Sequence, residues 1–506
     1  MKEKIRIPKY IYIIVIIYSI IFFSFAAIRH NNLQSNWDVG ISEEYVWNTI
    51  NGKFFFSDDL ELNYLGNHFH PIQILMLPAY YLFPETETMF LLQTLALTLS
   101  SLIIYHISQK KLENKTVSSI ITITYLIHPT IMLSLILDLH FMFYSIPLIL
   151  LAIYFAEENK WTYYWIFLVA SILVVEYISI VTLFMGIYIF ISKNKKQGLR
   201  TIIVSILAFI IIIQVIMPTL NPSSKYTHLD RYNYLGNNIK EIATNLMLHP
   251  IYEFNKVFTY NNFENSRYIL LMLGFNLFLP LGSLLSIITI PIISINILSL
   301  NYSQNCYSFY YSLIIVSIFF YATIKSLEKI KRKNIHLFKK MIVAFLIISI
   351  ILSIKFGFVP LINGETKSPI IENKCFNNHF SIINLINKVK SHDSIKYGSE
   401  IKEQISQIPE NESVLSTFHI YSQTTHKNES RNLRNQFFSL KRQCIVENYF
   451  LYDHTDSFSP FKKNFTDIKQ YFKDNNYNII WEKGEVVIFK KEHYNRECLN
   501  IIPLTK

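Results

Sequence analysis

Glycine and proline are scarce in this sequence, with 12 and 16 copies among 506 residues. Both residues interrupt helices, so their scarcity suits long continuous helices better than a loop-rich secreted scaffold. The same composition excludes a collagenous chain, which needs glycine at every third position. The apolar content described below excludes a disordered one.

Familiar motifs of soluble enzymes are also missing. The sequence contains no G-x-x-x-x-G-K-[ST], G-x-G-x-x-G, H-E-x-x-H or G-x-S-x-G string. We therefore do not expect this chain to drive transport with ATP by itself. Its four cysteines form no C-x-x-C pair and lack the close spacing of a zinc site, so a disulfide near the C-terminus and unpaired thiols both remain open. The cysteines are Cys306, Cys375, Cys444 and Cys498.

Apolar residues, by contrast, make up 51% of the chain, and the mean hydropathy is +0.26. This is more apolar surface than one soluble core can bury, so the excess is expected to face lipid. The net charge of +11 comes from Lys and Arg in short clusters between the apolar runs. Clusters of this kind favour anionic lipid headgroups over nucleic acid as the partner.

The apolar runs predict about eleven membrane spans. A further run at 71–83 has proline at its start and just after its end, and is too short to cross, so we expect a re-entrant or interfacial helix there. The predicted spans are 11–28, 88–107, 116–137, 141–156, 163–175, 177–192, 200–217, 268–284, 286–300, 309–326 and 341–357.

The distribution of positive charge orients these spans. If 71–83 does not cross, the basic clusters all fall on one side, which the positive-inside rule makes cytoplasmic. We therefore expect a multi-pass protein of the plasma membrane, with a cytoplasmic, uncleaved N-terminus and an extracytoplasmic C-terminus. The clusters are Lys2 to Lys9, Lys110 to Lys115, Lys193 to Arg200 and Lys325 to Lys340.

Two domains follow from this pattern. Residues 1–357 are expected to form an all-α transmembrane domain with outward loops at 29–87 and 218–267. Residues 358–506 are polar, with short apolar stretches between helical patterns such as 380–390, and predict a small soluble α/β domain. At this length the second domain can hold its own core.

Asp38 is the first candidate for chemistry, since it follows the first span directly. A carboxylate at the membrane interface can deprotonate a hydroxyl or hold a divalent ion beside a lipid phosphate. The alternative is a solvated loop acid or a helix N-cap. His68 and His70, spaced as i and i+2, are weaker candidates for metal binding beside Asp38, and ordinary polar histidines at the interface are the alternative.

Other candidates stand at predicted span ends. Asp138 and His140 lie at a membrane boundary, and Glu176 lies between two apolar runs, where it either serves a site or marks a turn. In the outward loop, Arg231 and Arg267 are suited to grip a phosphate, although surface solvation is the usual fate of loop cations. Lys225 and His228 belong to the same loop.

Several strings carry a resemblance. The segments NWDVGISEEYVWNTINGK (36–53), GNHFHPIQILMLPAYYLFP (66–84) and LLQTLALTLSSLIIYHIS (91–108) resemble a prokaryotic family of predicted membrane proteins defined only as a domain of unknown function. DLH at 138–140, YNYLGNNIKEI at 232–242 and RYILLMLG at 267–274 follow in the family's order. Where the family has a Pro-Glu pair after DLH, this chain has Phe141 and Met142, and Val175 and Tyr177 replace a Lys and an Asp around Glu176.

That family in turn resembles the C-class glycosyltransferases, which take sugars from polyprenyl-phosphate donors outside the membrane. The resemblance implies that the carboxylate of Asp38 serves as catalytic base or metal contact, and that His68, Asp138, His140 and Glu176 line the same substrate cavity. It makes a lipid-linked sugar the expected partner besides the bilayer, and leaves a divalent metal open as cofactor. The rival hypothesis is a non-enzymatic protein, either a lipid or solute carrier or a scaffold for envelope assembly.

Overall fold

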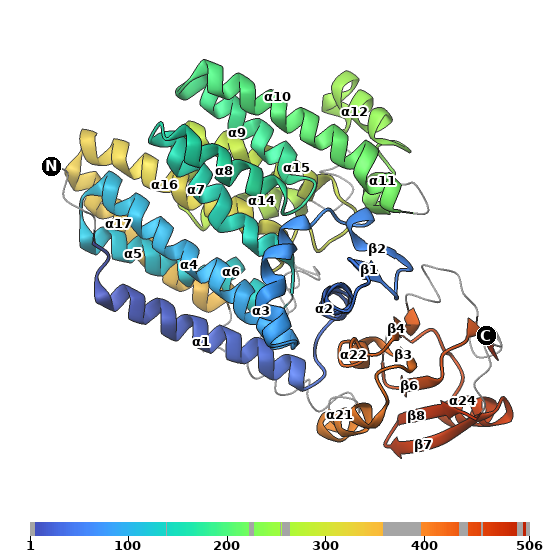
Figure 1. Ribbon diagram of the computed structural model, residues 1–506. Helices are drawn as coiled ribbons and strands as arrows, with labels where there is room; N and C mark the ends of the chain where they lie inside the picture. Colours follow the sequence, from blue (N-terminus) through green and yellow to red (C-terminus); the bar gives the residue numbers. More distant parts are fainter. Residues whose placement is uncertain are drawn as a thin grey trace.

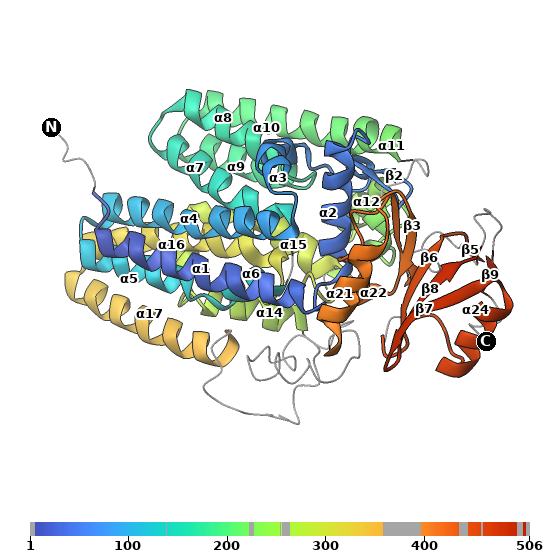
Figure 2. The ribbon, with the colours of Figure 1, turned by 60° about the horizontal axis from the view of Figure 1, so that its bottom comes forward.

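The computed structural model describes residues 6–137, 139–221, 227–253, 255, 264–357, 396–434, 444–456, 459–492 and 499–501. A body of helices carries a small sheet domain at one end, and the N-terminus lies at the opposite end of the helical body (Figure 1). Between the two parts lies the short helix α2 (Trp37–Ile50), which Figure 2 shows running across the end of the helical body.

Four helices of the described residues are long and apolar enough to cross a membrane. Each has at least 22 residues, and at about 1.5 Å per residue this exceeds the roughly 30 Å of a bilayer core. A fifth candidate span joins α5 (Lys115–Leu126) to α6 (Pro129–Leu137) through a 44° bend. The four are α1 (Lys9–Asn31), α4 (Thr86–Leu112), the continuous α10–α11 segment (Lys195–Leu220) and α17 (Ile335–Phe356).

The remaining apolar runs form shorter helices than the prediction of about eleven full spans requires. Apart from the 21-residue helix at Leu313–Lys333, none of them exceeds 17 residues, about 26 Å, because polar residues or prolines end them early. The run at 71–83 folds as a 3₁₀ turn, Pro71–Met76, followed by α3 (Leu77–Leu82). The others are α7 (Ser145–Glu157), α8 (Trp161–Ile172), α9 (Ile178–Ser192), α14 (Glu264–Gly274) and α15 (Ile290–Leu298).

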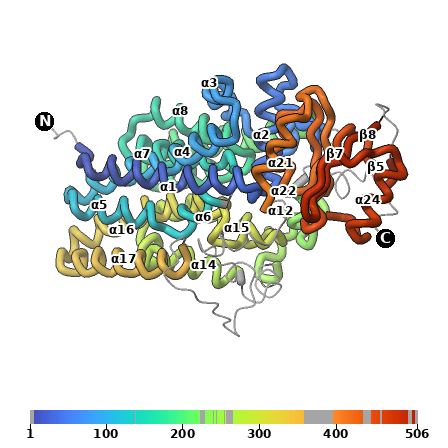
Figure 3. The backbone as a smooth tube through the Cα atoms, turned by 90° about the horizontal axis from the view of Figure 1, so that it is seen from below, coloured from blue at the N-terminus to red at the C-terminus, as the bar shows by residue number. Residues whose placement is uncertain are grey.

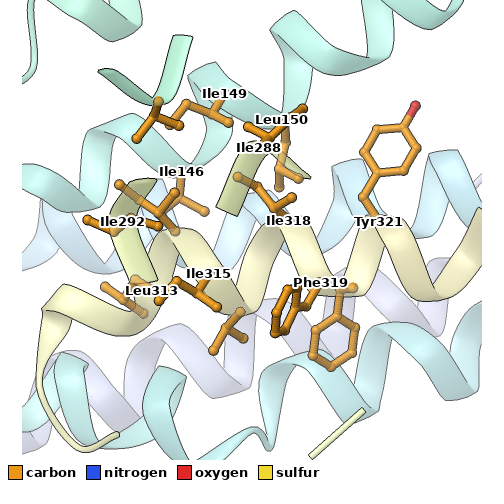
Figure 4. Close-up of a cluster of buried hydrophobic side chains, with 14 of the residues drawn as sticks. Ile146, Ile149, Leu150, Ile288, Ile292, Leu313, Ile315, Ile318, Phe319 and Tyr321 are labelled. Carbon is orange, nitrogen blue, oxygen red and sulfur yellow. The ribbon is translucent and has the colours of Figure 1, made fainter. Parts of the chain in front are cut away.

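Helix α16 (Leu313–Lys333) lies inside the helical body. All twelve residues from Leu313 to Ile324 are buried, which is typical of a helix that is apolar on every side. Figure 4 shows its side chains, including Ile315, Ile318 and Phe319, among those of α7 and α15. Helix α16 contacts α4, α6, α7 and α17, and in the view of Figure 3 it appears between α5 and α17.

The predicted cytoplasmic cations meet at the end of the helical body away from the sheet domain. Glu157, the last residue of α7, has a buried side chain, and its carboxylate lies 2.9 Å from the Nζ of Lys325 and 3.3 Å from that of Lys193. The Nζ of Lys111 is 3.8 Å away. One carboxylate thus joins cations from the ends of α4, α9 and α16, so the basic clusters share one end of the molecule.

The C-terminal domain is built on a mixed five-stranded sheet of order β4-β3-β6-β8-β7. The first three of these strands are parallel, and β8 is antiparallel to both of its neighbours. Helix α24 (Phe465–Asp474) covers one face and α21 (Gly398–Gln407) the other. The strands are β3 (Ser413–Ser416), β4 (Glu429–Asn432), β6 (Tyr449–Asp453), β7 (Tyr477–Lys483) and β8 (Val486–Lys491).

A small α/β domain was expected here, and a mixed sheet with helices on both faces is present. The amphipathic helix predicted at 380–390 lies outside the described residues. Two short pieces complete the domain: α22 (Phe418–Tyr421), and the strand pair β5 (Cys444–Ile445) with β9 (Leu499–Asn500).

The sheet domain is held on α2 by buried polar contacts. The carboxylate of Glu43 accepts hydrogen bonds from Thr425 (3.0 Å) and Tyr80 (3.2 Å) and lies 3.1 Å from the Nε2 of His426. The His426 ring also stacks on Trp47, with ring centres 4.1 Å apart. Because Glu43 is buried, each donor that is removed leaves its carboxylate less compensated for the loss of water.

Helices α9 and α10 approach closely at Gly198. A Cβ atom at this position would lie 2.4 Å from the backbone nitrogen of Phe190 and 2.5 Å from its Cα. Small residues allow such close packing of helices in membranes. At Gly274, in contrast, a Cβ atom would meet nothing within 4 Å.

The first prediction concerns this contact. Gly198→Ala forces the backbones of α9 and α10 apart, and overpacking of this kind costs about 1–3 kcal/mol. We expect a lower thermal unfolding midpoint for the purified protein in detergent. Gly274→Ala is the matched control, with no loss expected; an equal loss in both variants would contradict the close-contact explanation.

The second prediction concerns pH. Burial lowers the pKa of His426, but the charge of Glu43 outweighs burial and raises it above its ordinary 6.5. Burial raises the pKa of Glu43, but the charge and hydrogen bond of His426 outweigh burial and bring it to about 2. The contribution of His426 to folding stability is complete below its ordinary pKa of 6.5 and is lost as the pH rises through its raised pKa. The contribution of Glu43 is complete above its ordinary pKa of 4.5 and is lost as the pH falls towards about 2.

The pair of Glu43 and His426 should therefore stabilise the protein most between pH 4.5 and pH 6.5, and less as the solution becomes alkaline. We expect the thermal unfolding midpoint to decrease as the pH is raised from about 6 to about 9. The fall should be smaller in His426→Gln, which cannot gain the charge. A variant that follows the wild-type curve would assign the pH dependence to other groups.

Candidate functional site

Asp38 lies in the first turn of α2. The helix starts there because the side chain of Asn36 caps it, accepting a hydrogen bond from the backbone N–H of Val39 at 3.2 Å. The alternative that Asp38 is itself the N-cap is therefore wrong. Position in the first turn also places this carboxylate near the positive end of the helix dipole.

The carboxylate of Asp38 is only partly buried, and among the described residues no hydrogen bond or ion pair engages it. Burial raises its pKa, while the charges of His68, Arg231 and Arg434 oppose that rise. The nearby acid Glu44 differs, because its carboxylate accepts hydrogen bonds from Ser57 (2.7 Å) and from the backbone of Asp59 (3.0 Å). Asp38 is thus the acid of α2 that is available to a ligand.

Glu176 connects two loops next to this carboxylate. It is buried in the turn between α8 and α9, accepts a hydrogen bond from the backbone N–H of Phe69 at 3.1 Å, and lies 3.0 Å from the Nδ1 of His68. Burial raises its pKa, but the charge and hydrogen bond of His68 outweigh burial and lower it to about 2. Glu176 therefore does more than mark a turn, because it fixes the position of His68.

Four histidine rings gather beside Glu176. The rings of His68 and His228 stack with centres 4.1 Å apart, and that of His70 lies 5.3 Å from His68. His140 is 5.7 Å from His70 and stacks on Tyr310 at 3.9 Å. We call His68, His70, His140 and His228 the histidine cluster.

The histidine cluster lacks the geometry of a metal site. Within the described residues, no three His, Cys, Asp or Glu side chains are grouped so that they could hold a metal ion. The proposed ligand set of Asp38, His68 and His70 is therefore not assembled. The Nδ1 of His70 is hydrogen-bonded to the carbonyl of Val174, which ties this ring to the α8–α9 turn.

The two predicted arginines differ in position. Arg231 belongs to the 3₁₀ segment Thr227–Tyr232, and its charge acts on both Asp38 and His140. Arg267 lies in the first turn of α14, and no contact among the described residues joins it to Asp38 or His68. Asp138 lies outside the described residues.

Sequence reasoning missed two residues of this site. His228 was considered only as one cation of a loop, yet its ring stacks on His68. Arg434 belongs to the C-terminal domain, directly after β4, and its charge acts on Asp38. No local motif marks Arg434, because only the docking of the sheet domain brings it to α2.

Comparison with known proteins gives matches to solved structures and to one family. None of the curated proteins matches the chain. The oligosaccharyltransferase of Archaeoglobus fulgidus, in a crystal structure with a tethered acceptor peptide, is similar with 11% identity and a TM-score of 0.37. The match covers 82% of this chain and 63% of that enzyme, so the chain spans less than two thirds of its length.

The family model matches far more specifically along the sequence. It covers residues 29–488, which include α2, the histidine cluster, Glu176, and nearly all of the sheet domain. The chain belongs to the family of predicted membrane proteins DUF2079.

Proposed function

We propose that the protein is a membrane glycosyltransferase that moves a sugar from a polyprenyl-phosphate-linked donor to an acceptor hydroxyl. The observation that carries the proposal is the carboxylate of Asp38, which no described residue engages and which lies just beyond the end of the first span. A general base needs an acidic group that is accessible to substrate and held by a rigid element. Asp38 meets both conditions.

The roles follow from the positions. Asp38 takes the proton of the acceptor hydroxyl while the acceptor oxygen bonds to the anomeric carbon of the sugar. The bond from that carbon to the phosphate oxygen breaks, and Arg231 stabilises the negative charge on the departing phosphate. Burial raises the pKa of Asp38, which makes its carboxylate a stronger base than an exposed aspartate.

In this proposal His68 and His140 position the substrate and take no part in the proton transfer. Glu176 holds His68, and Gln93 accepts a hydrogen bond from the backbone N–H of His140 at 2.8 Å. The ring of His140 is held by the backbone N–H of Met142, which donates to its Nδ1 at 3.2 Å. Both rings therefore have a fixed position, as is needed to orient a sugar. Arg267, in the first turn of α14, stays a proposed substrate-binding residue.

The site is proposed to face the outside of the cell. Lys111, Lys193 and Lys325 gather at the opposite end of the helices, and basic residues accumulate on the cytoplasmic side. Cys306, which lies before α16 on the site's side, is disulfide-bonded, a state that is common in oxidising compartments and rare in the cytosol.

A carrier is the less favoured alternative. Transporters built from repeats have broken helices in corresponding positions of both halves. Among the described residues one bent pair, α5 with α6, passes the length and composition test for a span. A single pair does not favour the carrier.

The third prediction tests the base. Asp38→Asn keeps the shape of the side chain but removes its basicity, and we expect transfer from a polyprenyl-phosphate sugar to fall about 10²- to 10⁴-fold. Asp467→Asn is the matched control, since Asp467 is an exposed acid in the first turn of α24. Transfer by D38N at the wild-type rate would refute the assignment.

The fourth prediction tests the orientation. An exposed lysine of the sheet domain, Lys463, and one at the opposite end, Lys333, are each replaced by cysteine. A membrane-impermeant maleimide should label K463C in intact cells and K333C only after permeabilisation. The reverse pattern would place the site in the cytoplasm and remove the basis for an outer-face reaction.

A further inference from the structure

The end of the helical body away from the sheet domain gathers three lysines on one carboxylate. The side chain of Glu157 is 1% exposed. The Nζ of Lys325 lies 2.9 Å from its Oε1, and those of Lys193 and Lys111 lie 3.3 Å and 3.8 Å from its Oε2. We call Lys111, Lys193 and Lys325 the lysine cluster. Their side chains are 17–23% exposed, so the lysine cluster is half-buried and still reached from outside.

The three ammonium groups differ in their hydrogen bonds. That of Lys325 donates to the carboxylate of Glu157 at 2.9 Å and to the hydroxyl of Tyr188 at 2.6 Å. Those of Lys111 and Lys193 form ion pairs, but they donate no hydrogen bond to any residue that the structure describes. An ammonium group has three N–H donors. Lys111 and Lys193 therefore have donors for a further acceptor.

The charges around the lysine cluster do not balance. Glu328 pairs with Arg332 at 2.6 Å, and its carboxylate also lies 3.9 Å from the Nζ of Lys111. The lysine cluster and Arg332 thus supply four positive charges, whereas Glu157 and Glu328 supply two negative ones. Like charges that are held together away from bulk water repel one another. A further anion on the outer side of the lysines would offset this repulsion.

A buried hydroxyl next to the lysine cluster also lacks a partner. Tyr321 precedes Lys325 by four residues on α16, so both side chains lie on the same face of the helix. The hydroxyl oxygen of Tyr321 is buried and forms no hydrogen bond with the described residues. Figure 4 shows it pointing away from the labelled apolar side chains. A buried polar group without a partner indicates a place for water or for a ligand atom.

We propose that Lys111 and Lys193 form a phosphate-binding site at this end of the helical body. Their Nζ atoms face the same oxygen of Glu157, so both can donate to one phosphate group. Basic groups between the ends of transmembrane helices bind the phosphates of anionic lipids in this way, and a soluble phosphate has the same chemistry. The site lies at the opposite end from Asp38, so it stands independently of the proposed sugar transfer.

Binding to the full-length protein in an uncharged detergent tests the proposal. Native mass spectrometry measures retained phosphatidylglycerol, with phosphatidylcholine as the lipid without net charge, and calorimetry measures inorganic phosphate. We expect Lys111→Gln and Lys193→Gln each to weaken binding about 10-fold, and Lys193→Arg to retain it. Lys196→Gln is the matched control, because Lys196 is an exposed lysine at the start of α10 that pairs with no described residue.

The two probes distinguish the sources of the phosphate. Retention of phosphatidylglycerol alone assigns the site to a lipid headgroup, and binding of inorganic phosphate assigns it to the phosphate group itself. Either result supports the proposal when K193Q loses binding and K193R recovers it, since recovery excludes misfolding. Equal binding by the wild type, K111Q, K193Q and K196Q would overturn the proposal, as would a wild type that binds neither probe.

Discussion

The molecule depends on buried carboxylates of the first outward segment that find their partners in the C-terminal domain. Glu43 binds Thr425 and His426, and Asp59 binds Asn432. A buried carboxylate that loses its donors keeps the full cost of desolvation, so each of these contacts favours docking of the C-terminal domain on α2. They make the site a property of two domains rather than of the helical body alone.

The need for buried carboxylates at the contact with the C-terminal domain explains why the acidic residues of the first outward segment have different roles. The carboxylates of Glu43, Glu44 and Asp59 are engaged by hydrogen bonds from other residues. No hydrogen bond among the described residues engages the carboxylate of Asp38. Carboxylates of α2 and of the loop that follows it thus divide into those that hold the structure together and one that is proposed to act on a ligand. Burial does not distinguish Asp38 from Glu44, because it raises the pKa of both carboxyl groups. Their hydrogen-bond partners distinguish them.

Much of the helical body could be predicted from apolar runs, because a bilayer requires a minimum helix length. The number of full spans could not, since α8 and α9 end at the turn that contains Glu176, which the hydropathy pattern does not distinguish from two crossings. Family strings pointed to His68 and Glu176, and the structure brings these two into contact. Arg434 could not be found, because its relation to Asp38 depends on docking between distant parts of the chain.

The ion cluster at Glu157 constrains the architecture of the helical body. Only Lys193 and Asn194 separate α9 from α10, and the cations reach one carboxylate from several helix ends. Inserting one residue at this connection would rotate α10 by about 100° and turn Gly198 away from the backbone of Phe190. The length of this two-residue connection therefore determines which side chains of α10 meet α9.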